Sequence, residues 1–308
     1  MNAAVIGASR QISVARVPVP HPSAHEVRVA VEGSGVCASS LPVWQGRSWF
    51  QYPAAPGSPG HEGWGIIDAI GEDVADLRIG QRVAFLSNNA FAEHDLAPAD
   101  GVVVLPESLD GRLFPGEAIA CAMNAFRRSD IAAGQSVAVI GIGFLGAILV
   151  RLAADAGARV IAISRRSFAL DVARDFGAQT TIPIDDEPQL APLACDRVIE
   201  ATGLQEPLDL ASRIVRERGR LIIAGYHQDG HRTVDMQLWN WKGLDVVNAH
   251  ERERAAYVRG MRDAIDAVAS GRLHVEKLYT PYPLPRIERA FRALEERPDG
   301  FVKAVVTV

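Results

Sequence analysis

The sequence is poor in cysteine and in long apolar runs, and each shortage excludes a class of protein. Three cysteines in 308 residues are too few, and odd in number, for a disulfide scaffold. No apolar run approaches the ~18 residues that a membrane-spanning helix needs. The first residues lack the basic segment and the apolar stretch of a secretory signal. We therefore expect a cytoplasmic protein that does not bind membranes.

Lysine is also scarce, so arginine supplies nearly all of the positive charge; the lysines are Lys242, Lys277 and Lys303. The formal net charge of −5 argues against a protein that binds nucleic acids or anionic membranes. With 48% hydrophobic and 22% charged residues, the chain can bury a large core and is not disordered. Its length predicts about two domains.

The first part of the chain, to about residue 105, predicts short strands separated by turns. Segments 25–33, 62–71 and 81–87 are rich in β-branched residues and are bounded by Gly, Pro, Asp and Asn. This regular spacing is typical of a mostly-β, barrel-like domain.

The central part of the chain alternates strands and helices. A helix is predicted over 116–131 and an apolar strand over 136–141, and later a helix over 206–219 precedes a strand over 220–226. Such alternation predicts a parallel sheet covered by helices on both faces. This doubly wound, Rossmann-type domain is expected over residues 119–250.

The C-terminal segment, residues 251–308, is too short to form a domain of its own. We expect it to pack on the N-terminal β domain, so that the catalytic domain comprises 1–118 and 251–308. The predicted fold class is α/β, with the Rossmann-type parallel sheet inserted in a mostly-β domain.

The segment VAVIGIGFLG predicts a dinucleotide site. It sets Gly141, Gly143 and Gly146 in the G-x-G-x-x-G pattern, after a strand and at the start of a helix. Gly141 permits the tight turn, Gly143 lets the backbone approach a pyrophosphate, and Gly146 allows close packing of helix and strand. The helix N-terminus offers N–H groups to the phosphates. Phe144 and Leu145, between the last two glycines, belong to the same predicted site.

The end of the following strand indicates which dinucleotide binds. An NAD site would carry Asp or Glu there, whereas this sequence has Ser164, Arg165 and Arg166. A carboxylate would repel a 2′-phosphate, while Ser and Arg can hydrogen-bond to it and neutralise it. The sequence therefore predicts NADP(H) rather than NAD(H).

Two further segments hold side chains suited to zinc. GVCASS and SPGHEGWG contain Cys37, His61 and Glu62, a thiol, an imidazole and a carboxylate. Glu117 opens the helix that precedes the dinucleotide domain. Spacing alone does not establish a metal site, because a cysteine in a β domain is more often a buried small hydrophobic residue.

Taken together, GVCASS, GHEGWG, DVADLRIGQRVAF, VAVIGIGFLG and VIEATG resemble the zinc-dependent medium-chain dehydrogenase/reductases along essentially the whole chain. The alcohol and polyol members are the most similar. The resemblance implies a GroES-like catalytic domain around the Rossmann domain. It also implies one catalytic Zn²⁺, bound by Cys37, His61 and either Glu62 or Glu117. The lobe that carries a second, structural zinc is missing, since residues 87–100 contain no cysteine.

The resemblance also implies a reaction and two further roles. A hydride passes between NADP(H) and a secondary alcohol or ketone, such as a polyol, a sugar or a cyclitol. Ser39 takes the substrate proton, and Lys303 contacts the cofactor pyrophosphate. Two positions depart from the family. Ser40 replaces the Asp that orients the His ligand, and Pro42 replaces a relay His, which leaves the proton exit open.

Several alternatives therefore stay open. A metal-free NADPH-dependent enone or quinone reductase of the same fold is one, and a non-catalytic NADPH-binding protein is another. The expected partner is a small alcohol or carbonyl substrate rather than a nucleic acid. A homodimer or homotetramer is expected, because the apolar segment 238–247 offers a last strand for association.

Aromatic residues after Cys37 either line the substrate pocket or pack in the core; they are Trp44, Trp49, Phe50 and Tyr52. His250 leaves the last strand of the dinucleotide domain and is a candidate substrate contact. For a single histidine near a strand end, we favour a partly buried structural role.

Overall fold

The computed structural model describes residues 1–228 and 230–308, which form two compact units. Unit 1 comprises Met1–Ala120 and Glu253–Val308, and unit 2 comprises Cys121–Arg252. The predicted domain boundaries, after residues 118 and 250, each lie two residues before a unit boundary. None of the helices in the described ranges is both long enough and apolar enough to cross a membrane.

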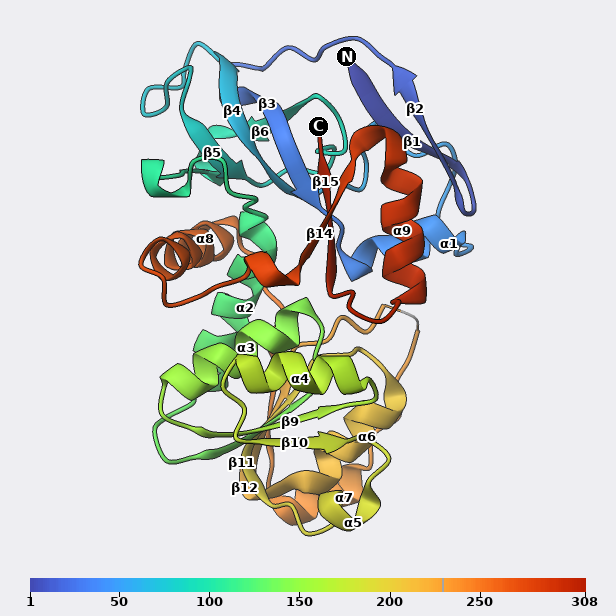
Figure 1. Ribbon diagram of the computed structural model, residues 1–308, viewed down its shortest axis with the longest axis vertical. Coiled ribbons are helices and arrows are strands. Elements are labelled where there is room, and N and C mark those ends of the chain that lie inside the picture. Colours follow the sequence, from blue (N-terminus) through green and yellow to red (C-terminus); the bar gives the residue numbers. More distant parts are fainter. Residues whose placement is uncertain (229) are drawn as a thin grey trace. The chain divides into compact units, whose positions relative to one another are not determined.

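Unit 1 is built on a seven-stranded sheet in the order β14-β15-β3-β4-β5-β7, with β6 also paired to β3 (Figure 1). The pairs are antiparallel except for β14 with β15. The strands β1 and β2 form a separate hairpin. The elements are β1 (Asn2–Ala8), β2 (Gln11–Arg16), β3 (Glu26–Gly35), α1 (Leu41–Gln45), β4 (Glu62–Ile70), β5 (Arg82–Phe85), β6 (His94–Pro98), β7 (Val102–Val104), α8 (Arg254–Ala269), β14 (Tyr279–Pro283), α9 (Ile287–Glu296) and β15 (Lys303–Thr307).

The period-2 pattern of β3 explains how this sheet buries its core. Val27, Val29 and Val31 are buried and alternate with partly exposed residues. They pack against Ile67 of β4 and Phe85 of β5. The alternation that predicted a strand over 25–33 is therefore the alternation that places these side chains in the core.

Unit 2 contains a six-stranded parallel sheet in the order β10-β9-β8-β11-β12-β13. This is the doubly wound arrangement, with α3 and α4 on one face and α6 and α7 on the other (Figure 1). The predicted fold class is thereby confirmed. The elements are α2 (Gly116–Ser129), which begins in unit 1, then β8 (Ser136–Ile140), α3 (Phe144–Asp155), β9 (Arg159–Ser164), α4 (Ser167–Asp175), β10 (Thr180–Pro183), α5 (Glu187–Leu190), β11 (Cys195–Glu200), α6 (Gln205–Ile214), β12 (Val215–Ile223), α7 (Met236–Lys242) and β13 (Asp245–Asn248).

The helix predicted over 206–219 is wrong at its C-terminal end. α6 ends at Ile214, and β12 already begins at Val215. The segment Val215–Arg220 is rich in Arg and Glu, which favour helices. Strand pairing overrides that preference. Val215 pairs with Cys195 of β11, and after a register shift Arg220 pairs with Arg197.

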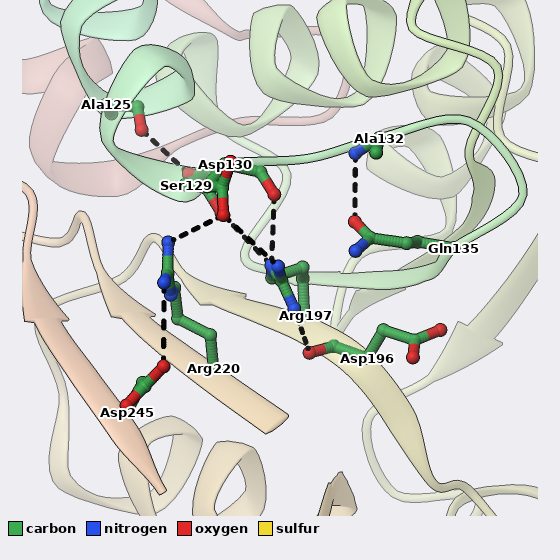
Figure 2. Close-up of polar contacts among 9 residues, drawn as sticks. All are labelled: Ala125, Ser129, Asp130, Ala132, Gln135, Asp196, Arg197, Arg220 and Asp245. Carbon is green, nitrogen blue, oxygen red and sulfur yellow. Dashed lines mark hydrogen bonds and ion pairs between the residues drawn. The ribbon is translucent and has the colours of Figure 1, made fainter. Parts of the chain in front are cut away.

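Arginine side chains connect three neighbouring strands of the unit 2 sheet to the end of α2. Figure 2 shows the side chain of Asp130 between those of Arg197 and Arg220. Arg220 Nη1 lies 3.3 Å from Asp130 Oδ2, and its Nη2 lies 3.5 Å from Asp245 Oδ2. The Arg197 Nε–H donates to the carbonyls of Ser129 and Asp130, each at 3.2 Å. Strands β11, β12 and β13 are thus tied to the segment that follows α2.

Candidate metal and dinucleotide sites

Strand pairing in unit 1 brings the predicted metal ligands together. Gly35, at the end of β3, pairs with Glu62 at the start of β4 and with Val305 of β15. Cys37 follows β3 by two residues and His61 immediately precedes β4, so the register sets thiol and imidazole side by side. The ligand atoms of Cys37, His61 and Glu62 all lie within 4.8 Å of one another.

The imidazole of His61 is held in one orientation by the backbone. Its Nδ1 lies 2.9 Å from the carbonyl oxygen of Pro59. Because a carbonyl can only accept, Nδ1 carries a proton, and Nε2 is the ring nitrogen that remains for a metal ion. The Oγ of Ser39 lies 3.5 Å from this Nε2. A backbone carbonyl thus holds the Nδ1–H of His61, as in the tautomer that binds a metal through Nε2.

The surroundings of His61 concentrate negative charge. Burial lowers the pKa of His61, but a hydrogen bond with Cys37 and the charges of Cys37, Glu117 and Glu62 outweigh it and raise the pKa to about 10. A bound divalent cation would offset that negative charge. Sulfur, imidazole nitrogen and carboxylate oxygen are also the donors that Zn²⁺ prefers. The residues present therefore fit a zinc ion.

Glu62 is engaged by a lysine. Lys303 Nζ lies 2.8 Å from Glu62 Oε1 and 2.6 Å from Oε2, and both side chains are buried. The backbone of Gly35 packs directly on the pair, since a Cβ there would lie 1.8 Å from Glu62 Oε2. The Lys303 ammonium is thus buried and paired with a carboxylate of its own unit, while its expected contact with a pyrophosphate stays a prediction.

Glu117 is a second carboxylate that acts on the cluster electrostatically, although the ligand atoms that lie within 4.8 Å of one another are those of Cys37, His61 and Glu62. It lies in the first turn of α2, in the part of that helix that belongs to unit 1, and is 9% exposed. Burial lowers the pKa of Lys303, but the charges of Glu62, Cys37 and Glu117, together with the hydrogen bond to Glu62, outweigh it and raise that pKa. The charges of Cys37, Glu62 and Glu117 therefore all act on both His61 and Lys303.

The glycine-rich turn of unit 2 has the geometry of a phosphate cradle. Gly141 has φ 95°, a left-handed conformation that favours glycine. A Cβ on Gly146 would lie 2.0 Å from the carbonyl oxygen of Gly141, so the helix packs tightly on the turn. Around Gly143, by contrast, a Cβ would meet no heavy atom within 4 Å. The turn is therefore open where a pyrophosphate would approach the start of α3 at Phe144 and Leu145.

The residues after β9 lie beside this turn. Ser164 is buried, and its Oγ accepts a hydrogen bond from the Arg166 N–H at 3.4 Å. Arg166 Nη2 lies 3.4 Å from the carbonyl oxygen of Ile142, within the glycine-rich turn, whereas Arg165 is exposed. Two guanidinium groups are thus carried by the strand end where a ribose phosphate would lie.

Comparison with known proteins identifies the family. The model described as "Alcohol dehydrogenase GroES-like domain" matches residues 23–107, and the one described as "Zinc-binding dehydrogenase" matches 145–268. The chain belongs to the medium-chain dehydrogenase/reductases. An alcohol dehydrogenase of Moraxella sp. (strain TAE123) is 32% identical over 219 residues, which are 59% of this chain and 63% of that protein.

Two further members of this family are similar over nearly their whole length. The 2-dehydro-3-deoxy-L-galactonate 5-dehydrogenase of Pseudoalteromonas atlantica is 25% identical over 323 residues, covering 92% of each protein. The crystal structure of galactitol-1-phosphate dehydrogenase from Escherichia coli superposes with a TM-score of 0.86 at 23% identity, covering 100% of both chains, which shows the shared fold. The predictions of the family and of an NAD(P)-dependent alcohol dehydrogenase are confirmed.

The aromatic residues that follow Cys37 differ in how deeply they are buried. Trp44 is fully buried and stacks on Phe291 with ring centroids 5.3 Å apart, so it is a core residue. Phe50 and Tyr52 pack against the same core cluster. Trp49 is 59% exposed, and its ring contacts that of Phe50 with centroids 5.0 Å apart. Packing therefore accounts for most of this segment.

Sequence reasoning missed a buried polar cluster at the end of β11. Glu200 is fully buried, and its Oε1 accepts from the N–H groups of Thr202 at 2.6 Å and Gly203 at 3.0 Å. Its Oε2 lies 2.9 Å from His227 Nε2. An acidic residue ending an apolar strand, in VIEATG, was the signal that could have revealed it.

Proposed function

We propose that the protein transfers a hydride between NADP(H) and a secondary alcohol or ketone at a site built around one zinc ion. The observation that carries this proposal is the cluster of Cys37, His61 and acidic side chains in a member of an alcohol dehydrogenase family. Its substrates are polyol-, sugar- or cyclitol-like. The galactonate-derived substrate in the name of one relative supports this class.

We further propose Cys37, His61 and Glu117 as the zinc ligands, with Glu62 as a neighbour of the site. Both carboxylate oxygens of Glu62 lie within 2.8 Å of Lys303 Nζ, so zinc bound to Glu62 would compete with a buried ion pair. Zinc content tests this directly. Glu117→Gln should lose the metal, whereas the charge-balanced Glu62→Gln/Lys303→Met variant should keep it. The opposite pattern would assign Glu62 as the ligand.

The chain's own residues account for the acid–base steps. A bound zinc ion supplies Lewis acidity, which favours the alkoxide of an alcohol at neutral pH. The Oγ of Ser39, beside His61 Nε2, accepts the substrate hydroxyl proton and passes its own proton onward. Pro42 has no side-chain group that can carry this proton, so the proton leaves by another route. Hydride transfer itself is the chemistry of the nicotinamide.

NADP(H) is the proposed cofactor because the strand that follows the glycine-rich turn ends in Ser164, Arg165 and Arg166. Arg166 reaches the turn itself, and its neighbour in the chain, Arg165, is exposed. Both can pair with a 2′-phosphate, and no carboxylate at these three positions would repel it.

A homodimer or homotetramer is proposed through the edge of the unit 2 sheet. β13 ends the strand order, and Val246 on it is 38% exposed. Trp241, at the end of α7, is 83% exposed. An uncovered strand edge beside a large exposed aromatic residue favours association. Light scattering should give a multiple of 33.2 kDa, and a monomer at micromolar concentration would contradict this part of the proposal.

One set of measurements tests the function as a whole. Metal analysis, NADPH titration and turnover of secondary alcohols are carried out on the same purified protein. Zinc together with alcohol oxidation supports the dehydrogenase. Turnover of enones or quinones without bound metal would support the reductase. NADPH binding without any turnover would support a non-catalytic role.

A further inference from the structure

Two aromatic rings lie at the carboxyl ends of β12 and β13, and the proposed mechanism does not use them. Tyr226 follows β12 by three residues, and His250 follows β13 by two. Their rings are stacked, with centroids 5.1 Å apart and planes inclined by 21°. Tyr226 is 48% exposed, and His250 is also exposed. Since stacking uses one face of each ring, the pair can offer an outer face to another flat group.

The loop that carries Tyr226 is bonded to the end of the neighbouring strand. Its next residue, His227, lies 2.9 Å through Nε2 from the buried carboxylate of Glu200. The Arg232 Nε–H donates to His227 Nδ1 at 3.1 Å, so Nδ1 has the lone pair and Nε2 carries the proton. Both nitrogens of the neutral imidazole are thus engaged.

Two more contacts fix the same loop. Arg232 Nη2 donates to the carbonyl oxygen of Gly203 at 2.9 Å. A Cβ on Gly225 would lie 2.2 Å from the nitrogen of Gly203, so the loops after β11 and β12 touch through their backbones. The position of Tyr226 is therefore set by hydrogen bonds and backbone packing rather than left to an unsupported loop, which lowers the entropy cost of binding.

The sheet topology indicates which ligand group reaches these rings. In a doubly wound sheet each half binds one mononucleotide, outside the carboxyl ends of its strands. The half formed by β8, β9 and β10 carries the glycine-rich turn and the arginines that suit the adenosine phosphate. The half formed by β11, β12 and β13 is left for the nicotinamide mononucleotide. Tyr226 and His250 lie at the carboxyl end of that second half.

We propose that Tyr226, stacked on His250, contacts the nicotinamide ring and selects its oxidised, cationic form over its reduced, neutral form. This inference rests on the proposed binding of a nicotinamide dinucleotide. The π face of a tyrosine ring attracts a cation, and this attraction is absent for a neutral ring. Partial burial, and then the charge of Arg252, lower the pKa of His250 against the opposite effect of Glu251. The lowered pKa favours the uncharged form of the supporting imidazole, which does not repel the cationic ring.

The test compares three nucleotides on the full-length protein. They are NADP⁺, NADPH and 2′-phospho-ADP-ribose, which retains the adenosine half but lacks nicotinamide. If the wild type binds NAD⁺ and NADH more tightly, these are used with ADP-ribose instead. Tyr226→Leu should weaken binding of the oxidised cofactor about two- to fivefold more than that of the reduced one. Affinity for the fragment should not change, and Tyr226→Phe, which keeps the ring, should behave as the wild type.

The outcomes separate this inference from the function on which it rests. An unchanged ratio of the two affinities in Tyr226→Leu, or an equal loss for all three nucleotides, overturns the role of Tyr226 while leaving the dinucleotide site intact. A wild type that binds none of the nucleotides overturns the proposed function and this inference with it. If Tyr226→Leu does not fold, His250→Leu replaces it, and the ratio should shift in the same direction.

Discussion

The ammonium of Lys303 and the carboxylate of Glu62 form a buried ion pair beside the candidate zinc site, with their side chains 6% and 1% exposed. The two residues are 241 positions apart in the chain and meet because β15 returns to pair with β3. Gly35 leaves no room for a larger side chain over the pair. The pair neutralises one of the two carboxylates at the site, which favours Glu117 as the zinc ligand.

Breaking this pair should destabilise the protein. Lys303→Met leaves the Glu62 carboxylate buried without a counter-charge, and the expected loss is about 3–5 kcal/mol in the free energy of unfolding. Glu62→Gln/Lys303→Met removes both charges and should lose much less. Urea unfolding of wild type, single and double variants measures both values. Equal losses in the single and double variants would show that the pair contributes through packing alone.

The same pair predicts how stability depends on pH. The folded-state pKa of Lys303 is raised above its usual value of 10.5. Its contribution is therefore complete below pH 10.5 and is lost as the pH rises through the folded-state pKa. Urea unfolding between pH 9 and pH 12 should show a loss in the wild type that the double variant lacks. Parallel curves for the two proteins would contradict this assignment.

The choice of cofactor should depend on the arginines after β9. Arg165→Ala and Arg166→Ala each remove a charge-assisted hydrogen bond to a 2′-phosphate, typically about 1.5–3 kcal/mol. Each should raise the Kd for NADPH roughly ten- to hundredfold and change the Kd for NADH little. Arg174→Ala, on the exposed face of α4, is the matched control. NADPH affinity that survives both substitutions would mean that the 2′-phosphate binds elsewhere.

Ser39 should affect turnover without affecting binding. Removing a general acid–base group typically costs about 10²–10⁴-fold in rate. We expect a loss of that order in Ser39→Ala, with zinc content and NADPH affinity unchanged, whereas Ser39→Thr keeps a hydroxyl and should retain part of the activity. Steady-state kinetics with metal analysis distinguishes these cases. A Ser39→Ala enzyme with wild-type turnover would remove this hydroxyl from the proton path.

Much of the fold follows from local sequence pattern. The alternation of Val27, Val29 and Val31 predicts a strand with one buried face, and the glycine-rich turn between β8 and α3 predicts a doubly wound sheet. The misplaced boundary between α6 and β12 shows where local pattern fails. Val215 joins β12 because it pairs with Cys195, and helix-favouring Arg and Glu residues cannot reveal such pairing.

The candidate site was predictable in its residue types but not in its contacts. Cys37 and His61 could be identified because they flank segments that resemble a family. The partner of Lys303 could not, since it depends on which strand β15 pairs with. The cluster of Glu200, His227 and Arg232 was missed for the same reason, because it joins loops that follow different strands of the sheet.

The metal content of the purified enzyme tests the central claim most directly. Zinc is measured by mass spectrometry on the wild type and on Cys37→Ser, alongside oxidation of a secondary alcohol by each. We predict about one zinc per chain in the wild type, and the loss of both zinc and activity in the variant. A metal-free protein that oxidises the alcohol at the wild-type rate would contradict the account.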